Sequence, residues 1–264
     1  MQSGLTLLGW AWLFASVARA AKKKPAPKKR ATKKTPAKQQ FRPVRWLMVW
    51  ARRVGLVLFA IMMLIVSLYA FVNPPTTQYM FSEGRRLGGV DQQWVSMDDI
   101  APVMARSVVA AEDANYCEHW GFDMSAIRDA LEDGSGRGAS TISQQVVKNV
   151  YLWQGRSWLR KALEAIMTPV VEMVWTKRRI LEVYLNVAEF GEGVFGVEAA
   201  SRNYFRVGPE DLTARQAATL AALLPNPKGR SATKPSAFVQ KRARSIADGA
   251  ATIKVDGRSA CFES

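Results

Sequence analysis

Apolar side chains recur every three or four residues along most of the chain after residue 80, and this spacing predicts an almost wholly helical domain. Capping residues mark three expected helix starts. Ser96 opens a capping-box pattern that places one start at Met97, while Thr176 and Thr213 precede two further apolar-periodic segments. Since no alternating strand pattern persists, we expect a mostly α fold over residues 80–264, long enough for one hydrophobic core.

A separate apolar run, Val54 to Val72, contains 19 residues without a charge. A helix of that length spans roughly 29 Å, about the thickness of a bilayer's hydrocarbon core. Four arginines between residues 42 and 53 precede this run, and none follows it closely. The positive-inside rule therefore predicts a transmembrane helix over residues 54–73, with the N-terminus in the cytoplasm and residues 80–264 outside it.

The basic character of the chain belongs to its N-terminal tail, residues 1–53. Fourteen of the 37 Lys and Arg residues lie in this tail, which leaves 23 basic against 22 acidic side chains in the remainder. The Lys/Pro/Ala-rich segment 22–38 is expected to be disordered and to favour anionic lipid, and nucleic acid is not an expected partner. The apolar run Leu5–Ala18 resembles a signal peptide without its basic n-region, so we interpret it as an uncertain N-terminal extension.

Glu112 places a carboxylate among apolar positions of the first predicted helix. It lies four residues after Val108 and eight after Met104, so helical spacing turns it to their buried side. Asp113, one residue later, is expected to turn about 100° away and stay in water. A carboxylate in apolar surroundings has a raised pKa, which suits a general acid or base. The alternative is a helix-end acid that reaches solvent.

Glu164 is a second acid at the border of an apolar helical stripe, three residues before Met167. Two carboxylates in different environments are the usual equipment for glycosyl chemistry, although paired acids also occur on plain solvated faces. Between the two acids lies a glycine-rich segment with hydroxyls, amides and a cation, which can face a sugar-like or polyanionic ligand. Its candidate binding residues are Ser140, Thr141, Ser143, Gln144, Gln145 and Lys148, with Arg156 beyond them.

The chain has two cysteines and one histidine. Cys117 and Cys261 could form a bridge in an oxidising compartment, but the expected fraying of the C-terminus favours two free thiols. His119 has no Cys/His cluster around it in the sequence, so a zinc site is not expected. We interpret His119 as a residue that holds the turn after the first helix.

Five segments in order closely resemble the motifs of the family 51 peptidoglycan glycosyltransferases, and more narrowly of the monofunctional transglycosylases of Gram-negative bacteria. The first three are AAEDANYCEHWGFD, RGASTISQQVVKN and GRSWLRKALE, and KRRILEVYLNVAEFGEGVFGVEAA is similar to the last two. The resemblance runs from about Trp94 to Pro227. Departures are mild: Tyr116 stands at a common Phe, Ala139 at a common Gly and Ser143 at a common Thr.

The resemblance implies a mostly α, lysozyme-like domain that polymerises lipid II at the periplasmic face of the inner membrane. Glu112 would be the base for the acceptor hydroxyl, and Glu164 would assist on the leaving-group side. Lys148 and Arg156 would face the pyrophosphate, and Ser140, Gln144 and Gln145 would bind substrate. No cofactor is required and no metal ligand is assigned, although Mg²⁺ or Mn²⁺ could take part. Expected partners are lipid II, the growing glycan chain, the membrane and other cell-wall synthesis proteins.

Two alternatives remain open at this point. A lytic muramidase could use a raised-pKa glutamate on similar helices, but it would have no pyrophosphate for Lys148 and Arg156 to neutralise. A non-catalytic membrane scaffold would not need both acids. Ser231 and Lys234 match the S-x-x-K pattern of transpeptidases, but no K-T-G follows, so we expect a monofunctional enzyme.

Overall fold

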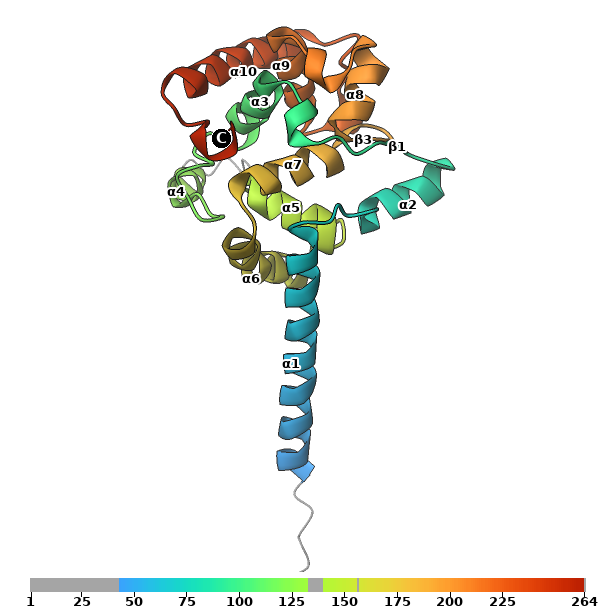
Figure 1. Ribbon diagram of the computed structural model, residues 1–264, viewed down its shortest axis with the longest axis vertical. Coiled ribbons are helices and arrows are strands. Elements are labelled where there is room, and N and C mark those ends of the chain that lie inside the picture. The colour runs from blue at the N-terminus through green and yellow to red at the C-terminus, as the bar shows by residue number, and fades with distance from the viewer. Residues whose placement is uncertain (1–42, 133–139, 156, 264) are drawn as a thin grey trace, which may run out of the picture. The chain divides into compact units, whose positions relative to one another are not determined.

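The computed structural model describes residues 43–132, 140–155 and 157–263, and most of them lie in helices (Figure 1). The chain divides into two units, residues 1–48 and residues 49–264. The basic segment 22–38, the apolar run Leu5–Ala18 and the candidate residue Arg156 lie outside the described residues. The predictions made for them therefore stay predictions.

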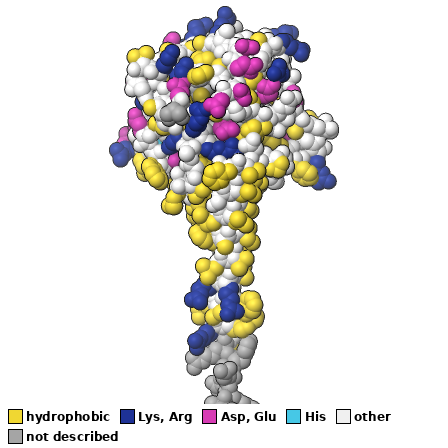
Figure 2. Space-filling model, in the orientation of Figure 1, with side chains coloured by type: hydrophobic (Ala, Val, Ile, Leu, Met, Phe, Trp, Pro, Cys, Tyr) yellow, Lys and Arg dark blue, Asp and Glu magenta, His cyan; other side chains and the backbone are white. Residues whose placement is uncertain are grey.

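The helix α1, Pro43–Tyr69, is long and apolar enough to cross a membrane. Its 27 residues extend roughly 40 Å. Most of its large apolar side chains are exposed, and Figure 2 shows hydrophobic side chains covering its visible face, with basic ones toward its N-terminal end. The helix takes in residues 54–69 of the predicted span and ends four residues before Asn73. An exposed apolar helix of this kind is stable where lipid replaces water around it.

Two groups of helices make up most of the second unit. In one group α3 packs against α9 and α10, and in the other α5 packs against α6 and α7 (Figure 1). The remaining bounds are α2 Gln78–Leu87, η1 Met97–Asp99, α3 Pro102–Glu112, α4 Met124–Glu132, α5 Ile142–Tyr151, α6 Trp158–Val174, α7 Lys177–Val187, α8 Gly196–Phe205, η2 Pro209–Asp211, α9 Ala214–Leu223, η3 Pro227–Gly229, α10 Ala237–Val255 and α11 Ala260–Glu263. A continuous hydrophobic core joins the two groups and contains the buried aromatic residues Tyr116, Tyr184, Phe190, Phe195 and Phe262.

The fold also contains a small sheet, which the sequence did not predict and which packs against α8. Its strands are β1 Asp91–Gln92, β2 Glu189–Gly191 and β3 Val194–Phe195, in the order β1-β3-β2. The strand β3 runs parallel to β1 and antiparallel to β2. Strands of two or three residues are too short for an alternating pattern to be detected in the sequence.

Two of the three predicted helix starts are confirmed. Thr176 caps α7 by accepting a hydrogen bond from Arg179 N, and Thr213 forms a complete capping box at the start of α9. The prediction of a helix start at Met97 is wrong, because α3 begins at Pro102. Proline favours the first helical position, where its missing N–H is not needed, and it disfavours helical geometry in the residue before it. Met97–Asp99 forms only a short 3₁₀ turn.

Cys117 and Cys261 form a disulfide, so the expectation of two free thiols is wrong. The C-terminal segment is held in place rather than frayed. The side chain of Phe262 is fully buried against the core, and α11 packs against α7. This packing brings Cys261 to the first sequence motif, 144 residues away along the chain.

Arg179 ties the end of α1 to the rest of the second unit. Its guanidinium donates to the carbonyl oxygens of Tyr69 and Val72 at 3.1 Å each and to Asn73 Oδ1 at 3.0 Å. The same group lies over the ring of Trp94. These carbonyls lie at and beyond the helix end, where no further helical N–H can satisfy them.

Replacing Arg179 with Ala should loosen this junction. We expect the loss of several charge-assisted hydrogen bonds to cost about 2 kcal/mol or more, which lowers Tm by roughly 5 °C in a domain of this size. Limited proteolysis in detergent should then cut residues 70–77 faster. The neighbouring Arg178→Ala is the control, because Arg178 contacts Phe262 and Asp98 instead. Equal protease resistance in both variants would contradict the assignment.

Candidate active site

Glu112 is the last residue of α3, and its carboxylate is largely buried. Oε2 accepts a hydrogen bond of 3.0 Å from Gln145 Nε2. Oε1 is buried and has no hydrogen-bond partner among the described residues. Burial raises the pKa of Glu112, and the hydrogen bond from Gln145 and the nearby cations offset this only in part. One oxygen of a proton acceptor is thus held while the other is free to take a proton.

Asp113 is buried, so the expectation that it stays in water is wrong. The helix ends at Glu112, and Asp113 leaves helical geometry, with φ −162° and ψ 70°. Its Oδ1 lies 2.8 Å from His119 Nε2, and its Oδ2 accepts a hydrogen bond of 2.9 Å from the backbone N–H of Ile142. The helical 100° rule fails here because it applies only while the helix continues. His119 holds the turn after α3, as predicted.

Gln144 and Gln145 both lie in the first turn of α5, but their side chains bind different partners. The amide oxygen of Gln144 accepts from Thr141 N in a capping box, so this side chain is already used to start the helix. The amide nitrogen of Gln145 donates to Glu112, and its oxygen accepts from Tyr184 Oη at 3.2 Å. These contacts indicate that Gln144 stabilises the start of α5 and that Gln145 orients the carboxylate of Glu112.

Lys148 and Glu164 form the second part of the site. Burial lowers the pKa of Lys148, and the charges of Glu164 and Glu112 oppose this effect. Glu164 is buried, as its spacing predicted, and it is paired with Arg160 at 2.9 Å and with Lys161 at 2.5 Å. Lys161 Nζ also lies 3.2 Å from Ser140 Oγ. The cluster therefore brings Ser140, Lys148 and Glu164 together within a group of cations.

Two arginines near Glu112 were missed by the sequence reasoning. Arg242 of α10 has Nη2 3.9 Å from Glu112 Oε1, and the same group donates to Ala111 O. Burial lowers the pKa of Arg230, with Arg242 adding to the effect, and Arg230 in turn acts on Glu112. Both arginines follow Pro227, where the recognised motifs end, so no local pattern connected them with the site.

Two cavities adjoin the Glu112–Gln145 pair. One, of about 270 Å³, is lined by residues that include Glu112, Asn115 and Ser140. The other, of about 330 Å³, is lined by Gln145 and Lys148 and by residues of α2, α7 and η3. A larger apolar cavity between α9 and α10 contains none of these residues. The arrangement can accommodate one polar group on each side of a buried base.

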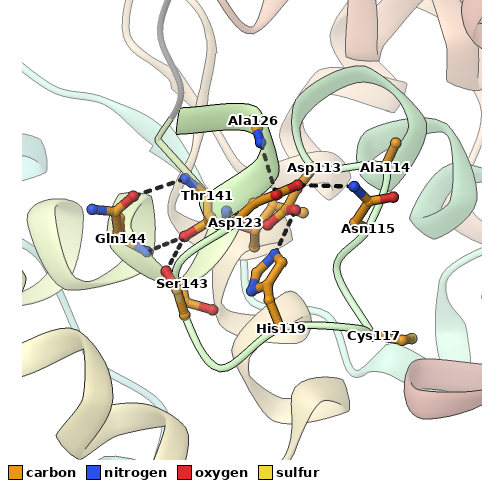
Figure 3. Close-up of polar contacts among 12 residues, drawn as sticks. Asp113, Ala114, Asn115, Cys117, His119, Asp123, Ala126, Thr141, Ser143 and Gln144 are labelled. Carbon is orange, nitrogen blue, oxygen red and sulfur yellow. Dashed lines mark hydrogen bonds and ion pairs between the residues drawn. The ribbon is translucent and has the colours of Figure 1, made fainter. Parts of the chain in front are cut away.

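Asp113, His119 and Asp123 offer ligand atoms within 4.8 Å of one another, a group that the sequence did not reveal. His119 Nε2 and the carboxylates of Asp113 and Asp123 are already hydrogen-bonded, whereas the buried His119 Nδ1 has no partner among the described residues. Burial raises the pKa of Asp123, but hydrogen bonds from Ser125, Ala126 N and Asn115 outweigh it and lower the pKa to about 2 (Figure 3). Both oxygens of Asp113 are likewise engaged. A resident cation would have to break these bonds, so we assign none here.

A sequence profile of the family described as Transglycosylase matches residues 82–251. The chain belongs to this family. It is 62% identical over 218 residues to a biosynthetic peptidoglycan transglycosylase of Jannaschia sp. (strain CCS1), covering 83% of this chain and 90% of that protein. A protein of the same name from Caulobacter vibrioides is 45% identical over 210 residues, covering 78% and 92%. A third, from Pectobacterium atrosepticum, is 59% identical over 154 residues, covering 56% and 63%.

The match shows that this transglycosylase has the expected mostly helical, lysozyme-like domain. It also reaches past Pro227, where the recognised motifs end. The matched region contains Arg230 and Arg242 as well as Glu112 and Lys148. The cations found only in the structure therefore lie within the family domain.

The raised pKa of Glu112 and the lowered pKa of Lys148 predict a bell-shaped pH dependence for this transglycosylase. A general base at Glu112 has to be ionised, and a cation that stabilises the leaving group at Lys148 has to be charged. The acidic limb should therefore lie above the usual glutamate range and the alkaline limb below the usual lysine range. Gln145→Ala removes a hydrogen bond that favours the carboxylate, so the acidic limb should move to higher pH.

The measurement is kcat/KM for glycan formation as a function of pH in wild type and variant. Gln240→Ala is a matched control, because Gln240 is an exposed amide bonded only to Pro235 O among the contacts described. An acidic limb that stays in place, or moves to lower pH, would show that Gln145 does not support the ionised form of Glu112.

Proposed function

We propose that the chain polymerises lipid II into β-1,4-linked glycan strands and releases undecaprenyl pyrophosphate. It is a peptidoglycan transglycosylase by family and by the names of its relatives. The pairing of a half-satisfied, buried Glu112 with a nearby group of cations supports this chemistry best. Glu112 can accept a proton, and the cations can receive the negative charge of a departing pyrophosphate.

In the proposed reaction Glu112 Oε1 takes the proton of the 4-hydroxyl of the acceptor GlcNAc. The hydroxyl oxygen attacks the anomeric carbon of the lipid-linked MurNAc of the donor, and a new C–O bond forms. The bond from that carbon to the pyrophosphate breaks on the opposite face, and its electron pair leaves with the pyrophosphate. An α-linked donor therefore gives a β-linked product, with inversion.

Lys148 and Arg156 would neutralise the charge that develops on the leaving group. Burial makes the Lys148 charge effective, because few waters screen it. Glu164 is held between Arg160 and Lys161, so it would fix the positions of two further cations. A divalent cation carried by the pyrophosphate would add to this neutralisation, and that role stays a prediction.

A membrane location follows from the substrate and from two exposed apolar surfaces. The polyprenyl tail of lipid II cannot leave the bilayer, and α1 is a candidate anchor in the same bilayer. Large apolar side chains also stand exposed on α6, and Trp175 directly after α6 donates from Nε1 to Val66 O of α1. The exposed residues are Trp158, Leu159, Ile166 and Met173. We propose that α6 lies at the membrane surface beside α1.

We also propose that residues 80–264 lie in the periplasm, with the tail in the cytoplasm. The arginines before residue 54 support this orientation through the positive-inside rule. The Cys117–Cys261 disulfide supports it independently, because such bonds persist in oxidising compartments. Association with other cell-wall synthesis proteins remains an expectation from the resemblance alone.

Glu112→Gln should abolish polymerisation while the protein stays folded. Removing the general base is expected to lower kcat by about 100-fold to 10,000-fold. The measurement is the glycan ladder that purified protein in detergent makes from fluorescent lipid II, with digestion by a muramidase to identify the product. Glu118→Gln, an exposed acid in the same motif, is the matched control. Ladders from the Glu112 variant would refute the base assignment, and none from folded wild type would refute the polymerase.

Lys148→Ala should slow turnover by about 100-fold to 1,000-fold, as loss of a buried electrostatic stabiliser does. The lost interaction forms fully only as the pyrophosphate departs, so kcat should fall more than KM rises. Steady-state kinetics with lipid II provide the test, and Lys241→Ala, an exposed lysine on α10, is the control. A loss below tenfold would count against contact with the leaving group.

A further inference from the structure

We propose that the Cys117–Cys261 disulfide positions the active site, so that the enzyme reaches full activity only after oxidation of these two thiols. The inference rests on the proposed transglycosylase function. It concerns two named segments: the Asp113 loop, residues 113–120, and the C-terminal clasp, residues 256–263. The bridge joins one to the other, with the two Cα atoms 5.7 Å apart.

The clasp contacts the Asp113 loop and the helices α3 and α7. Arg258 Nη1 donates to Ala114 O at 3.0 Å, and the ring of Phe262 lies 6.2 Å from that of Tyr116 between centroids. The carbonyl of Phe262 accepts from Arg178 Nη1 of α7 at 3.0 Å. Glu263 forms an ion pair with Arg106 of α3. The clasp therefore closes over the outer side of the loop.

The Asp113 loop in turn sets the geometry of the base. Asp113 follows Glu112 directly, and its carboxylate holds both His119 and the backbone N–H of Ile142. Three residues after Ile142, Gln145 holds Glu112 Oε2. A displacement of the loop would change the approach of α5 to α3. A misplacement of about 1 Å at a reacting centre can lower a rate by about 100-fold.

The covalent bond adds to the packing of Phe262, because much of the clasp is short and exposed to water. The helix α11 has four residues, and one isolated turn is not stable in water. Arg258 is partly exposed, so its hydrogen bond to the loop competes with water. Within the clasp, Phe262 and Ser259 are the buried residues. The disulfide is the one link between the clasp and the loop that breaks only by reduction.

Formation of the bridge follows thiol–disulfide exchange. The thiolate of one cysteine attacks an oxidant that carries a disulfide, and a mixed disulfide forms while one oxidant sulfur leaves as a thiolate. The second cysteine then attacks the mixed disulfide, the intramolecular S–S bond forms, and the second oxidant sulfur leaves. Two electrons and two protons pass from the cysteines to the oxidant. Both cysteines are only partly buried, so an oxidant can reach them.

The test compares oxidised and reduced full-length enzyme in detergent. Dithiothreitol reduces the bridge, alkylation traps the thiols, and lipid II polymerisation is measured at a temperature at which circular dichroism shows both forms folded. We expect kcat to fall by between about tenfold and 100-fold, with KM changed less. Cys117→Ser/Cys261→Ser should match the reduced enzyme and be insensitive to dithiothreitol. Equal kcat in folded oxidised and reduced enzyme would overturn the proposal.

Hydrogen exchange supplies a readout that does not depend on activity. Reduction should speed exchange of the amides of Tyr116, Glu118 and Ile142, and leave the amides of the α7 residues 180–185 unchanged. Unchanged exchange in the Asp113 loop would overturn the proposal even if activity fell. Absence of glycan from the oxidised enzyme would contradict the proposed function instead, and the exchange measurement would still decide the role of the bridge.

In cells the proposal means that the enzyme becomes fully active only after export, when the two cysteines are oxidised. Thiol trapping with a maleimide-linked polymer should show the bridge formed in protein from the membrane fraction and absent from a variant that lacks residues 54–65, which keeps Val66, Tyr69 and Val72. A bridge formed equally well in the cytoplasm would overturn the link between export and activity.

Discussion

The carboxylate of Asp113 is the constraint on which the rest of the site depends. Asp113 follows the last residue of α3. One of its carboxylate oxygens contacts His119 Nε2, and the other accepts a hydrogen bond from the N–H of Ile142, the first residue of α5. A buried carboxylate that loses such partners leaves an uncompensated charge, which is strongly destabilising. The end of one helix and the start of the next are thereby held at a fixed separation. Glu112 lies one residue before this tie and Gln145 three residues after it, so their contact follows from it.

The two acids on either side of this tie are in opposite electrostatic situations. Glu112 has one neutral donor, Gln145, and an arginine 3.9 Å from its other oxygen, and burial outweighs both and raises its pKa. Glu164 has two cations within hydrogen-bond distance and is fully paired. This difference suits the roles proposed for them, proton transfer at Glu112 and charge organisation at Glu164. The negative charges of both acids act on Lys148, and each raises its pKa against the effect of burial.

Contacts also hold both ends of the domain that carries the site, the segment after α1 and the C-terminal clasp. Arg179 fixes the residues that follow α1, and the disulfide with its surrounding contacts fixes the C-terminus against the first motif. The first attachment suits an enzyme whose substrate stays in a membrane, since tethering raises the effective concentration of the substrate. The second protects a loop that must hold a buried charge in position.

The sequence by itself determined the helices, their main caps, the apolar candidate for a membrane span, and the chemistry that the motifs carry. These features are local, because spacing, capping and charge are properties of neighbouring residues. The sequence also predicted the burial of Glu112 and Glu164, since both lie within the helical segments whose apolar periodicity was read. Arg156 lies outside the described residues, so its contact with the pyrophosphate stays a prediction.

Only the tertiary structure decided where those regularities stop. Asp113 is buried because the helix ends one residue earlier, and α3 starts at Pro102 because proline favours that position over Met97. The Cys117–Cys261 pair, the approach of Arg242 to Glu112, and the β1–β3 pairing join residues more than 100 positions apart. Such contacts depend on how helices pack, and packing energy is summed over many residues. No local pattern records it.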